Sequence, residues 1–233
     1  MKVTTIIPAA GRGERMKIKK VSKQYLPLGG RPILVHTLLV FEKCPFVEEI
    51  ILAIGETEID CCQRDIVKRF GLRKVKRVVV GGERRQDSVY NALKMVREDC
   101  HIVLIHDSVR PFITREIIQR TIEETKVHKA VATAVPVTDT IKEGNGLGFV
   151  ERTLNRDRLW SIQTPQGFEI NLIKEACSRA QEENFYGTDE ASLVERIGHP
   201  VKVIEGSHEN IKITTPEDLI IAEAILRERG SGS

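Results

Sequence analysis

The chain has 233 residues, 41% of them hydrophobic and 30% charged, which is the composition of a folded globular protein rather than a disordered one. Its net charge of +3 is too small to indicate a nucleic-acid-binding protein by bulk electrostatics. No apolar run approaches the ~18 residues that cross a bilayer, so we expect neither nucleic acid nor membrane as a partner. The five cysteines, odd in number and without a CxxC pair or a preceding secretory signal, indicate reduced thiols in a cytoplasmic protein.

Short apolar runs rich in β-branched residues recur along the chain and predict strands. They lie at residues 3–9, 49–55, 76–82, 101–107 and 130–137. Because they are nearly continuous rather than alternating, they are typical of strands buried on both faces of a parallel sheet. Helical patterns lie between them, at residues 32–44, 57–71, 85–98 and 114–128. This alternation predicts an α/β fold with a doubly wound, mostly parallel sheet, in which ligands bind at the carboxyl ends of the strands.

Residues 136–160 interrupt this alternation. Polar and apolar residues alternate there around a Gly-Asn-Gly turn, which predicts a β-hairpin. Since an isolated hairpin is only marginally stable in water, we expect it to pack against something else, such as a partner subunit.

The rest of the sequence returns to helices and a strand. We predict helices near 169–183 and 189–197, a strand at 200–206, and a closing helix from Pro216, preceded by Thr215, to about Glu228. There is no repeat or low-complexity linker. We therefore predict a single domain at residues 1–228, with a projecting β-hairpin arm at about 137–158, and a tail at 229–233.

The first predicted strand runs into IIPAAGRGERM, residues 6–16, a loop rich in glycine and arginine. The dinucleotide-binding fingerprint needs a third glycine where this chain has Met16, and the Walker A pattern needs a Gly-Lys-Ser/Thr that does not follow here. Two interpretations remain. The loop could bring backbone N–H groups to phosphate oxygens, with Arg12 and Arg15 adding positive charge, or it could be a plain tight turn.

Further polar clusters follow other predicted strands and loops. They are SKQYLPLGGRPIL (22–34), GGERRQDSV (81–89), HDSVRPF (106–112), TDEASLVE (188–195) and NIKIT (210–214). Groups that follow separate strands of an α/β sheet can converge on one edge. Arg15, Lys23 and Lys212 would supply cations at such an edge. Together with the carboxylate of Asp107, they fit a metal–triphosphate site.

Seven motifs in order resemble the 2-C-methyl-D-erythritol 4-phosphate cytidylyltransferase family of the non-mevalonate isoprenoid pathway. They are PAAGRGERM with KQYLPLGGRPIL, GGERRQDSV, HDSVRP, PVTDTIK, QTPQGF, TDEAS and ENIKITTPEDL, spread from about residue 3 to 226. Two departures from the family pattern change loop packing rather than charge. Ser22 stands where a proline commonly precedes the Lys-Gln pair, and Val109 stands where an alanine is usual.

The resemblance implies a Rossmann-like nucleotidyltransferase fold and a cytidylyltransferase reaction. A phosphate oxygen of methylerythritol phosphate would attack the α-phosphorus of CTP in line, and pyrophosphate would leave. The attacking oxygen already carries negative charge, so no protein base is needed. Positioning and electrostatic stabilisation would then carry the catalysis.

The resemblance also implies roles for individual residues. The expected catalytic residues are Arg15, Lys23, Arg156 and Lys212. Nucleotide binding is expected of Ala9, Ala10, Gly11, Gly13, Gly82, Glu83 and Ser88. Binding of the second substrate is expected of Asp107, Arg110, Thr140 and Thr164, with Arg156 and Lys212, and Asp107 is also expected to hold Mg²⁺. In the family, Thr140 and Arg156 reach the site from the arm of the other subunit, so a homodimer is expected.

Several charged residues also have a purely structural interpretation. A solvated surface charge is an equal alternative for Arg12, Arg84 and Arg85. We interpret His106 as a hydrogen-bonded structural residue rather than a catalytic base. Asp189 and Glu190 are interpreted as caps of a helix rather than as metal ligands.

Four alternative functions can be weighed from the sequence. A cytidylyltransferase for ribitol 5-phosphate would share the nucleotide half and differ in the acceptor residues of the arm. A sugar-1-phosphate nucleotidyltransferase would share the opening loop, but GGERRQDSV and TDEAS favour a cytidylyltransferase. An NAD-binding oxidoreductase is disfavoured by the missing third glycine, and a non-catalytic nucleotide-binding protein would be expected to lack Lys23 or Asp107.

Overall fold

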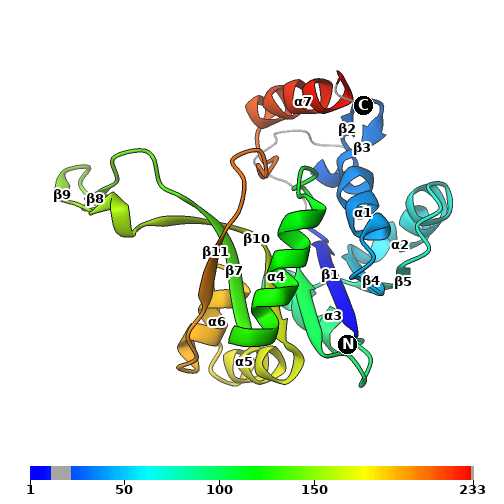
Figure 1. The fold of residues 1–233 in the computed structure, drawn as a ribbon, viewed down its shortest axis with the longest axis horizontal. Helices are drawn as coiled ribbons and strands as arrows, with labels where there is room; N and C mark the ends of the chain where they lie inside the picture. The colour runs from blue at the N-terminus through cyan, green and yellow to red at the C-terminus, as the bar shows by residue number, and fades with distance from the viewer. Residues whose placement is uncertain (12–21, 232–233) are drawn as a thin grey trace.

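A seven-stranded sheet forms the centre of the computed structural model, which describes residues 1–11 and 22–231 (Figure 1). The order of its strands is β11–β7–β10–β6–β1–β4–β5. Their bounds are Val3–Ala9 (β1), Glu49–Ile54 (β4), Val75–Val80 (β5), Ile102–Ile105 (β6), Ala130–Pro136 (β7), Trp160–Glu169 (β10) and Lys202–Glu205 (β11). All of them run parallel except β10, which is antiparallel to both β6 and β7. The predicted mostly parallel sheet is confirmed.

The strand β10 was not predicted from the sequence. Its ten residues include Pro165 and Gly167, two residue types that weaken a strand pattern. Its pairing with β7 shifts register between Ile162 and Gln166. The pairing of the strand is thus irregular close to Pro165 and Gly167, the residues that interrupt the apolar pattern expected of a strand.

Helices cover both faces of the sheet, as a doubly wound fold requires. One face packs against α1 (Ile33–Lys43), α2 (Ile59–Cys62) with its π-helical continuation Gln63–Lys68, and α4 (Arg115–His128). The other packs against α3 (Arg85–Leu93), α5 (Ile170–Glu182) and α6 (Glu190–Arg196). Ile7 of β1 points into the first core and Ile6 into the second, because successive side chains of a strand alternate. No helix within the described residues is long and apolar enough to cross a membrane.

Two predicted helices differ from the structure in extent. The helix expected over 57–71 begins with a 3-10 turn, Glu56–Glu58, before α2. The helix expected over 85–98 ends at Leu93. Beyond that point Met95 and Val96 donate backbone hydrogen bonds three residues back, so the chain tightens into turns while Val96 stays buried.

A third, smaller core holds the last helix, α7 (Pro216–Ser231), over the carboxyl end of β6. Its buried side chains include Leu28, Val109 and Ile213. Leu28 ends the short strand β2 (Pro27–Leu28), which pairs with β3 (Arg31–Pro32) through a two-residue turn. Gly29 and Gly30 both have positive φ in this turn, 55° and 79°, a backbone region that glycine adopts without strain. This core holds the chain just after Lys23, through Leu26 and Leu28, and on either side of Lys212, through Ile211 and Ile213.

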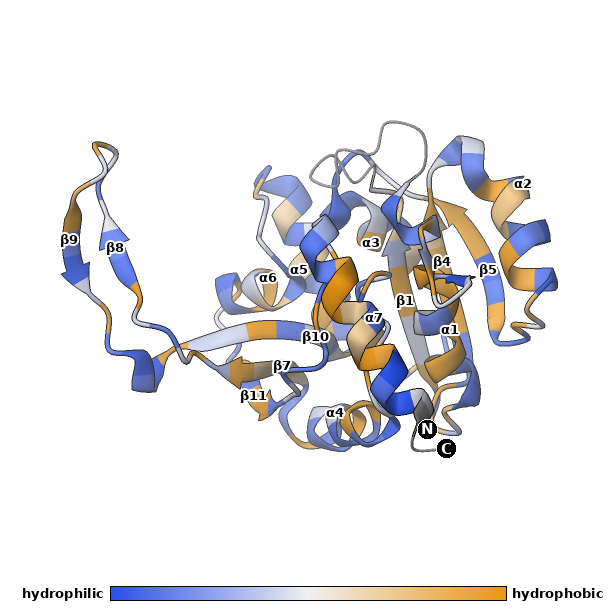
Figure 2. Ribbon diagram, turned by 90° about the horizontal axis from the view of Figure 1, so that it is seen from above, coloured by the Kyte–Doolittle hydropathy of each residue, from blue (hydrophilic) through white to orange (hydrophobic). Residues whose placement is uncertain are grey.

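The hairpin arm projects from the body of the molecule, at the left in Figures 1 and 2. Strands β8 (Lys142–Gly144) and β9 (Val150–Thr153) form its tip. The side chain of Asn145 accepts hydrogen bonds from the N–H groups of Leu147 and Phe149, and this closes the turn. Leu147 and Phe149 are 83% and 70% exposed, so the arm leaves apolar surface uncovered in a single chain.

Candidate functional site

A cavity of about 200 Å³ opens where β1, β5 and β6 end. Nine predicted site residues line it: Ala9, Ala10, Gly11, Lys23, Gly82, Glu83, Ser88, Asp107 and Lys212. We call it the first cavity. It adjoins a wider cleft that Gly55 and Thr57 border. Another hollow, beside Lys2 and Arg77, borders the opposite ends of the strands and contains none of the predicted residues.

The loop of residues 81–84 approaches the end of β1 very closely. A Cβ added to Gly81 would lie 2.4 Å from the Cβ of Ala10, and one added to Gly82 would lie 2.2 Å from the Cβ of Asp87. Glycine is therefore required at both positions. The N–H of Gly82 donates to Oγ of Ser88 at 3.0 Å, and that hydroxyl donates to the carbonyl of Arg84. Ser88 thus holds the loop that brings backbone polar groups to the cavity.

Lys23 is positioned by its two neighbours in the sequence. Nε2 of Gln24 donates to the carbonyl of Ala9 at 2.7 Å and is buried, so it joins the Lys23 turn to the end of β1. The hydroxyl of Ser22 donates to the carboxylate of Glu58 at 2.7 Å. Ser22 therefore anchors the loop by a hydrogen bond at the position where the family pattern commonly has proline.

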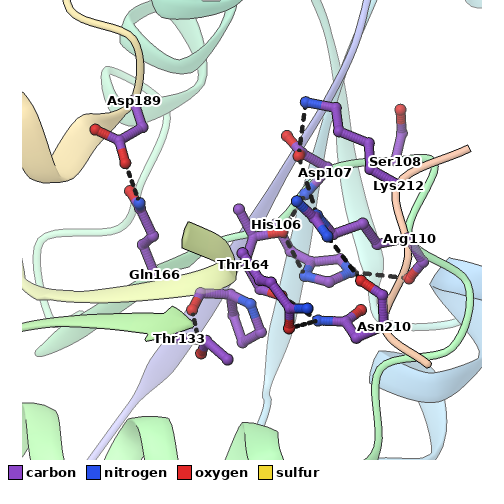
Figure 3. Close-up of polar contacts among 12 residues, drawn as sticks. His106, Asp107, Ser108, Arg110, Thr133, Thr164, Gln166, Asp189, Asn210 and Lys212 are labelled. Atoms are coloured by element: carbon purple, nitrogen blue, oxygen red, sulfur yellow. Dashed lines mark hydrogen bonds and ion pairs between the residues drawn. The ribbon is translucent and has the colours of Figure 1, made fainter. Parts of the chain in front are cut away.

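The carboxylate of Asp107 lies among three cations. Nε of Arg85 is 2.9 Å from Oδ1, whereas Nζ of Lys212 and Nε of Arg110 are 2.9 and 3.4 Å from Oδ2. Figure 3 shows Lys212 and Arg110 converging on this carboxylate. Burial alone would raise the pKa of Asp107, but the cations outweigh it and hold that pKa well below its usual range. The group is therefore an anion that organises its cationic neighbours.

Arg85 is not a solvated surface charge, and that interpretation of the sequence was wrong. Its Nη1 lies 2.8 and 2.6 Å from the two carboxylate oxygens of Glu190, whose side chain is buried. Glu190 is consequently an ion-pair partner rather than a helix cap, and burial raises its pKa despite this pairing. Asp189 does cap α6, since it accepts a hydrogen bond from the N–H of Ser192 at 3.0 Å.

His106 and Thr164 form a buried hydrogen-bonded pair behind Asp107 (Figure 3). Nε2 of His106 lies 3.1 Å from the carbonyl of Arg110, and because a carbonyl only accepts, Nε2 carries the proton. Nδ1 then accepts from the hydroxyl of Thr164 at 3.0 Å, and that hydroxyl accepts from the N–H of Asp107. Burial lowers the pKa of His106 to about 4, so the ring is neutral and structural.

A second cavity, of about 250 Å³, lies on the other side of Asp107. It shares Arg85, Asp107 and Lys212 with the first cavity. The rest of its lining is Arg110, Ile162, Gln163, Thr164, Gln166, Thr188 and Asp189. Two anionic groups could therefore bind on either side of one cationic cluster. Sequence reasoning missed Thr188 as a lining residue, although the TDEAS motif that it begins was noted.

The remaining predicted residues lie elsewhere. Thr140 and Arg156 are exposed on the arm, where Nη1 of Arg156 donates to the carbonyl of Thr138 at 3.0 Å. Neither lines the two cavities. Gly13 and Arg15, with Arg12, lie outside the described residues.

A divalent cation could be held here by one carboxylate together with phosphate oxygens. Within residues 1–11 and 22–231, no group of three or more His, Cys, Asp or Glu side chains is arranged to hold a metal ion. Mg²⁺ keeps several waters and needs only one or two carboxylates beside substrate phosphates. The ionised Asp107, between the two cavities, fits that requirement.

The family model for 2-C-methyl-D-erythritol 4-phosphate cytidylyltransferase matches residues 3–228. A protein of that name from Alkaliphilus metalliredigens is 49% identical over 99% of this chain and 95% of its own length. Another of that name, from Syntrophus aciditrophicus, is 47% identical over 97% of each chain.

Solved structures agree with these sequence comparisons. The crystal structure of 4-diphosphocytidyl-2C-methyl-D-erythritol synthase from Anaerococcus prevotii superimposes with a TM-score of 0.86 at 35% identity and covers 97% of this chain and 96% of its own. The crystal structure of 2-C-methyl-D-erythritol 4-phosphate cytidylyltransferase from Thermus thermophilus gives 0.80 at 33% identity, over 97% of this chain and 100% of its own.

Proposed function

The chain belongs to the 2-C-methyl-D-erythritol 4-phosphate cytidylyltransferase family, and from this premise we propose how its side chains carry the reaction. It transfers a cytidylyl group from CTP to 2-C-methyl-D-erythritol 4-phosphate and releases pyrophosphate, a step of the non-mevalonate pathway to isoprenoid precursors. A bond forms between an acceptor phosphate oxygen and the α-phosphorus of CTP, and the bond from that phosphorus to the bridging oxygen of pyrophosphate breaks.

The observation that carries the proposal is the meeting of two cavities at the ion cluster of Asp107. The first cavity takes CTP and the second takes the acceptor phosphate, so the α-phosphorus and its nucleophile meet beside Lys212 and Arg85, which line both. Because the acceptor phosphate is already anionic, the chemistry needs cations and alignment rather than a base. The neutral, buried His106 is in keeping with that requirement.

CTP binding falls to the loops at the ends of β1 and β5. Backbone groups of Ala9, Ala10 and Gly11 face the first cavity from one side, and Gly82 and Glu83 from the other. Ser88 contributes by holding this loop in place. Lys23 contacts the triphosphate and stabilises the charge that develops on it in the transition state. Gly13 and Arg15 lie outside the described residues, and the family resemblance is the ground on which we propose that they add to triphosphate binding.

The acceptor phosphate is bound by Arg110 and Lys212 in the second cavity. Both cations pair with Oδ2 of Asp107, and they can turn toward a phosphate while Arg85 keeps Oδ1. Thr164 lines this cavity, and we propose that it serves acceptor binding through Asp107. Its hydroxyl donates to Nδ1 of His106 and accepts from the N–H of Asp107, so it orients the backbone of Asp107.

Asp107 would hold Mg²⁺ together with the phosphates of CTP. The ion supplies charge neutralisation on the triphosphate when it is bound. Oδ1 and Oδ2 of Asp107 both pair with cationic side chains. A metal ion held by this carboxylate would replace part of that pairing. Glu190 would continue to hold Arg85 through its ion pair with Nη1.

The arm completes the site of a second copy of the chain in a homodimer. Thr140 and Arg156 lie outside both cavities of their own chain, and the exposed Leu147, Phe149 and Val150 give the arm an apolar surface to bury. A hairpin of this size needs such a partner to be stable. Arg156 would then reach the acceptor phosphate of the other subunit.

A pyrophosphate-release assay tests the function. The purified chain with Mg²⁺ is incubated with each of the four ribonucleoside triphosphates, and with methylerythritol phosphate or ribitol 5-phosphate as acceptor. We expect release only with CTP and methylerythritol phosphate. A rate with ribitol 5-phosphate that equals or exceeds this would contradict the assignment of the second cavity.

A further inference from the structure

Three consecutive residues at the start of α3 contact the segment of residues 185–190. This segment borders the second cavity, which we assign to the acceptor. The guanidinium carbon of Arg84 lies 3.7 Å from the ring centre of Tyr186. Arg85 pairs with Glu190. Gln86 bonds the backbone on both sides of Tyr186. The loop of residues 81–84 at the first cavity therefore continues directly into the residues that hold the lining of the second.

Gln86 differs from its two neighbours because it lines neither cavity. Its Nε2 donates to the carbonyl of Phe185 at 2.9 Å, and its Oε1 accepts from the N–H of Gly187 at 2.9 Å. The side chain is 8% exposed. One buried amide thus satisfies a backbone acceptor and a backbone donor of a segment about a hundred residues away in the sequence.

The segment has little freedom at its other end. Nε2 of Gln166 donates to Asp189 at 2.6 Å. A Cβ added to Gly187 would lie 2.2 Å from Oγ of Ser192, so the backbone is packed directly onto α6. Between Gly187 and Asp189 stands Thr188, which lines the second cavity. Its position is set on one side by Gln166 and on the other by Gln86.

We propose that Gln86 is a positioning residue for the acceptor phosphate, which acts through the segment that carries Thr188. The inference rests on the proposed assignment of the second cavity to the acceptor. Loss of the amide leaves the part-buried carbonyl of Phe185 and the part-buried N–H of Gly187 without this partner. The segment then relaxes away from the cavity so that both groups regain hydrogen bonds. A shift of this kind weakens acceptor binding, because productive contacts depend on distances of a fraction of an ångström.

The test compares Gln86→Leu, which keeps the side chain's bulk and removes both hydrogen bonds, with the wild type in the full chain. We expect the acceptor KM to rise about tenfold or more while the KM for CTP changes less than about twofold. Gln119→Leu is the matched control, because Gln119 is half-buried on α4, lines neither cavity, and donates from its side-chain amide to Glu123. It should leave both KM values unchanged.

A double-mutant cycle separates positioning from general loosening of the fold. If Gln86 acts through Thr188, the rise in acceptor KM caused by Gln86→Leu should be smaller in a Thr188→Ala background than in the wild type. Should Gln86→Leu not fold, Gln86→Asn, which is one methylene too short to reach both partners, is measured in the same way. The inference would be overturned if the effects of the two substitutions on the acceptor KM were additive. It would also be overturned if the Gln86 variant left the acceptor KM unchanged or raised both KM values equally.

Failure of this inference is distinguishable from failure of the proposed function. If the wild-type chain does not convert CTP and methylerythritol phosphate, the proposed function is wrong. If the wild type is active and the Gln86 variants do not separate the two KM values, only the role of Gln86 is wrong.

Discussion

Nη1 of Arg85 pairs with both carboxylate oxygens of Glu190, at 2.8 and 2.6 Å, between the first turns of α3 and α6. The same guanidinium holds Oδ1 of Asp107. The glutamate therefore fixes the arginine, and the arginine fixes the aspartate at the junction of the two cavities.

Replacement of Glu190 by glutamine should destabilise the fold by about 2 kcal/mol, because it leaves Arg85 with one charged partner in a largely buried place. Chemical unfolding in urea measures the change. Glu183→Gln is the control, since the ion pairs of Glu183 with Arg179 and Arg196 are far more exposed and should be worth less than about 1 kcal/mol. Equal stability losses in the two variants would show that burial of the Arg85 pair has no energetic consequence.

Lys23→Ala should lower kcat by at least about a hundredfold, since a charge-stabilising contact made in the transition state is lost. The variant should remain folded, because the side chains of Gln24 and Ser22 anchor the turn. Steady-state pyrophosphate release measures the effect. A near wild-type rate would remove Lys23 from the catalytic residues.

Arg156→Ala should chiefly raise the KM for the acceptor and leave that for CTP nearly unchanged. Intersubunit complementation then tests whether the arm serves a partner. The assay uses an acceptor concentration well below the raised KM, at which Arg156→Ala chains and Lys212→Ala chains should each show little activity. When the two are mixed and allowed to exchange, they should recover up to about a quarter of wild-type activity, because half of the dimers regain one intact site. No recovery despite demonstrated exchange would mean that Arg156 does not act in the site of another subunit.

Stability should depend on the ionisation of His106. A histidine whose pKa is lower in the folded than in the unfolded chain makes the folded state bind fewer protons. Its contribution is therefore complete above the unfolded pKa of ~6.5 and is lost as the pH falls toward the folded pKa of about 4.

The wild type should lose about 2 kcal/mol more stability between pH 7 and pH 5 than His106→Gln does. Urea unfolding at the two pH values measures this difference. Parallel losses in the two proteins would mean that the folded-state pKa of His106 is not lowered.

Much of the sheet could be predicted from the sequence, because the parallel strands β1, β4, β6 and β7 are buried on both faces and appear as continuous apolar runs. β10 could not, since Pro165 and Gly167 interrupt its pattern. Its antiparallel place between β6 and β7 depends on pairing with strands distant in the sequence.

The convergence of Lys23, Asp107 and Lys212 followed from the topology of an α/β sheet, whose carboxyl ends meet at one edge. The pairing of Arg85 with Glu190 did not, because the two residues are 105 positions apart and meet only through the placement of α3 beside α6 on one face. The inward orientation of Thr164 was equally invisible, since it depends on the ring of His106 from another strand end.

The central claim is that one ion cluster holds the nucleotide on one side and the acceptor phosphate on the other. A crystal structure of the chain with Mg²⁺, a non-hydrolysable CTP analogue and methylerythritol phosphate tests it most directly. We expect the acceptor phosphate beside Arg110 and Lys212, with an oxygen about 3.5 Å from the α-phosphorus and in line with the leaving group. An acceptor phosphate bound away from the second cavity, with Asp107 still paired only to protein cations, would contradict the account.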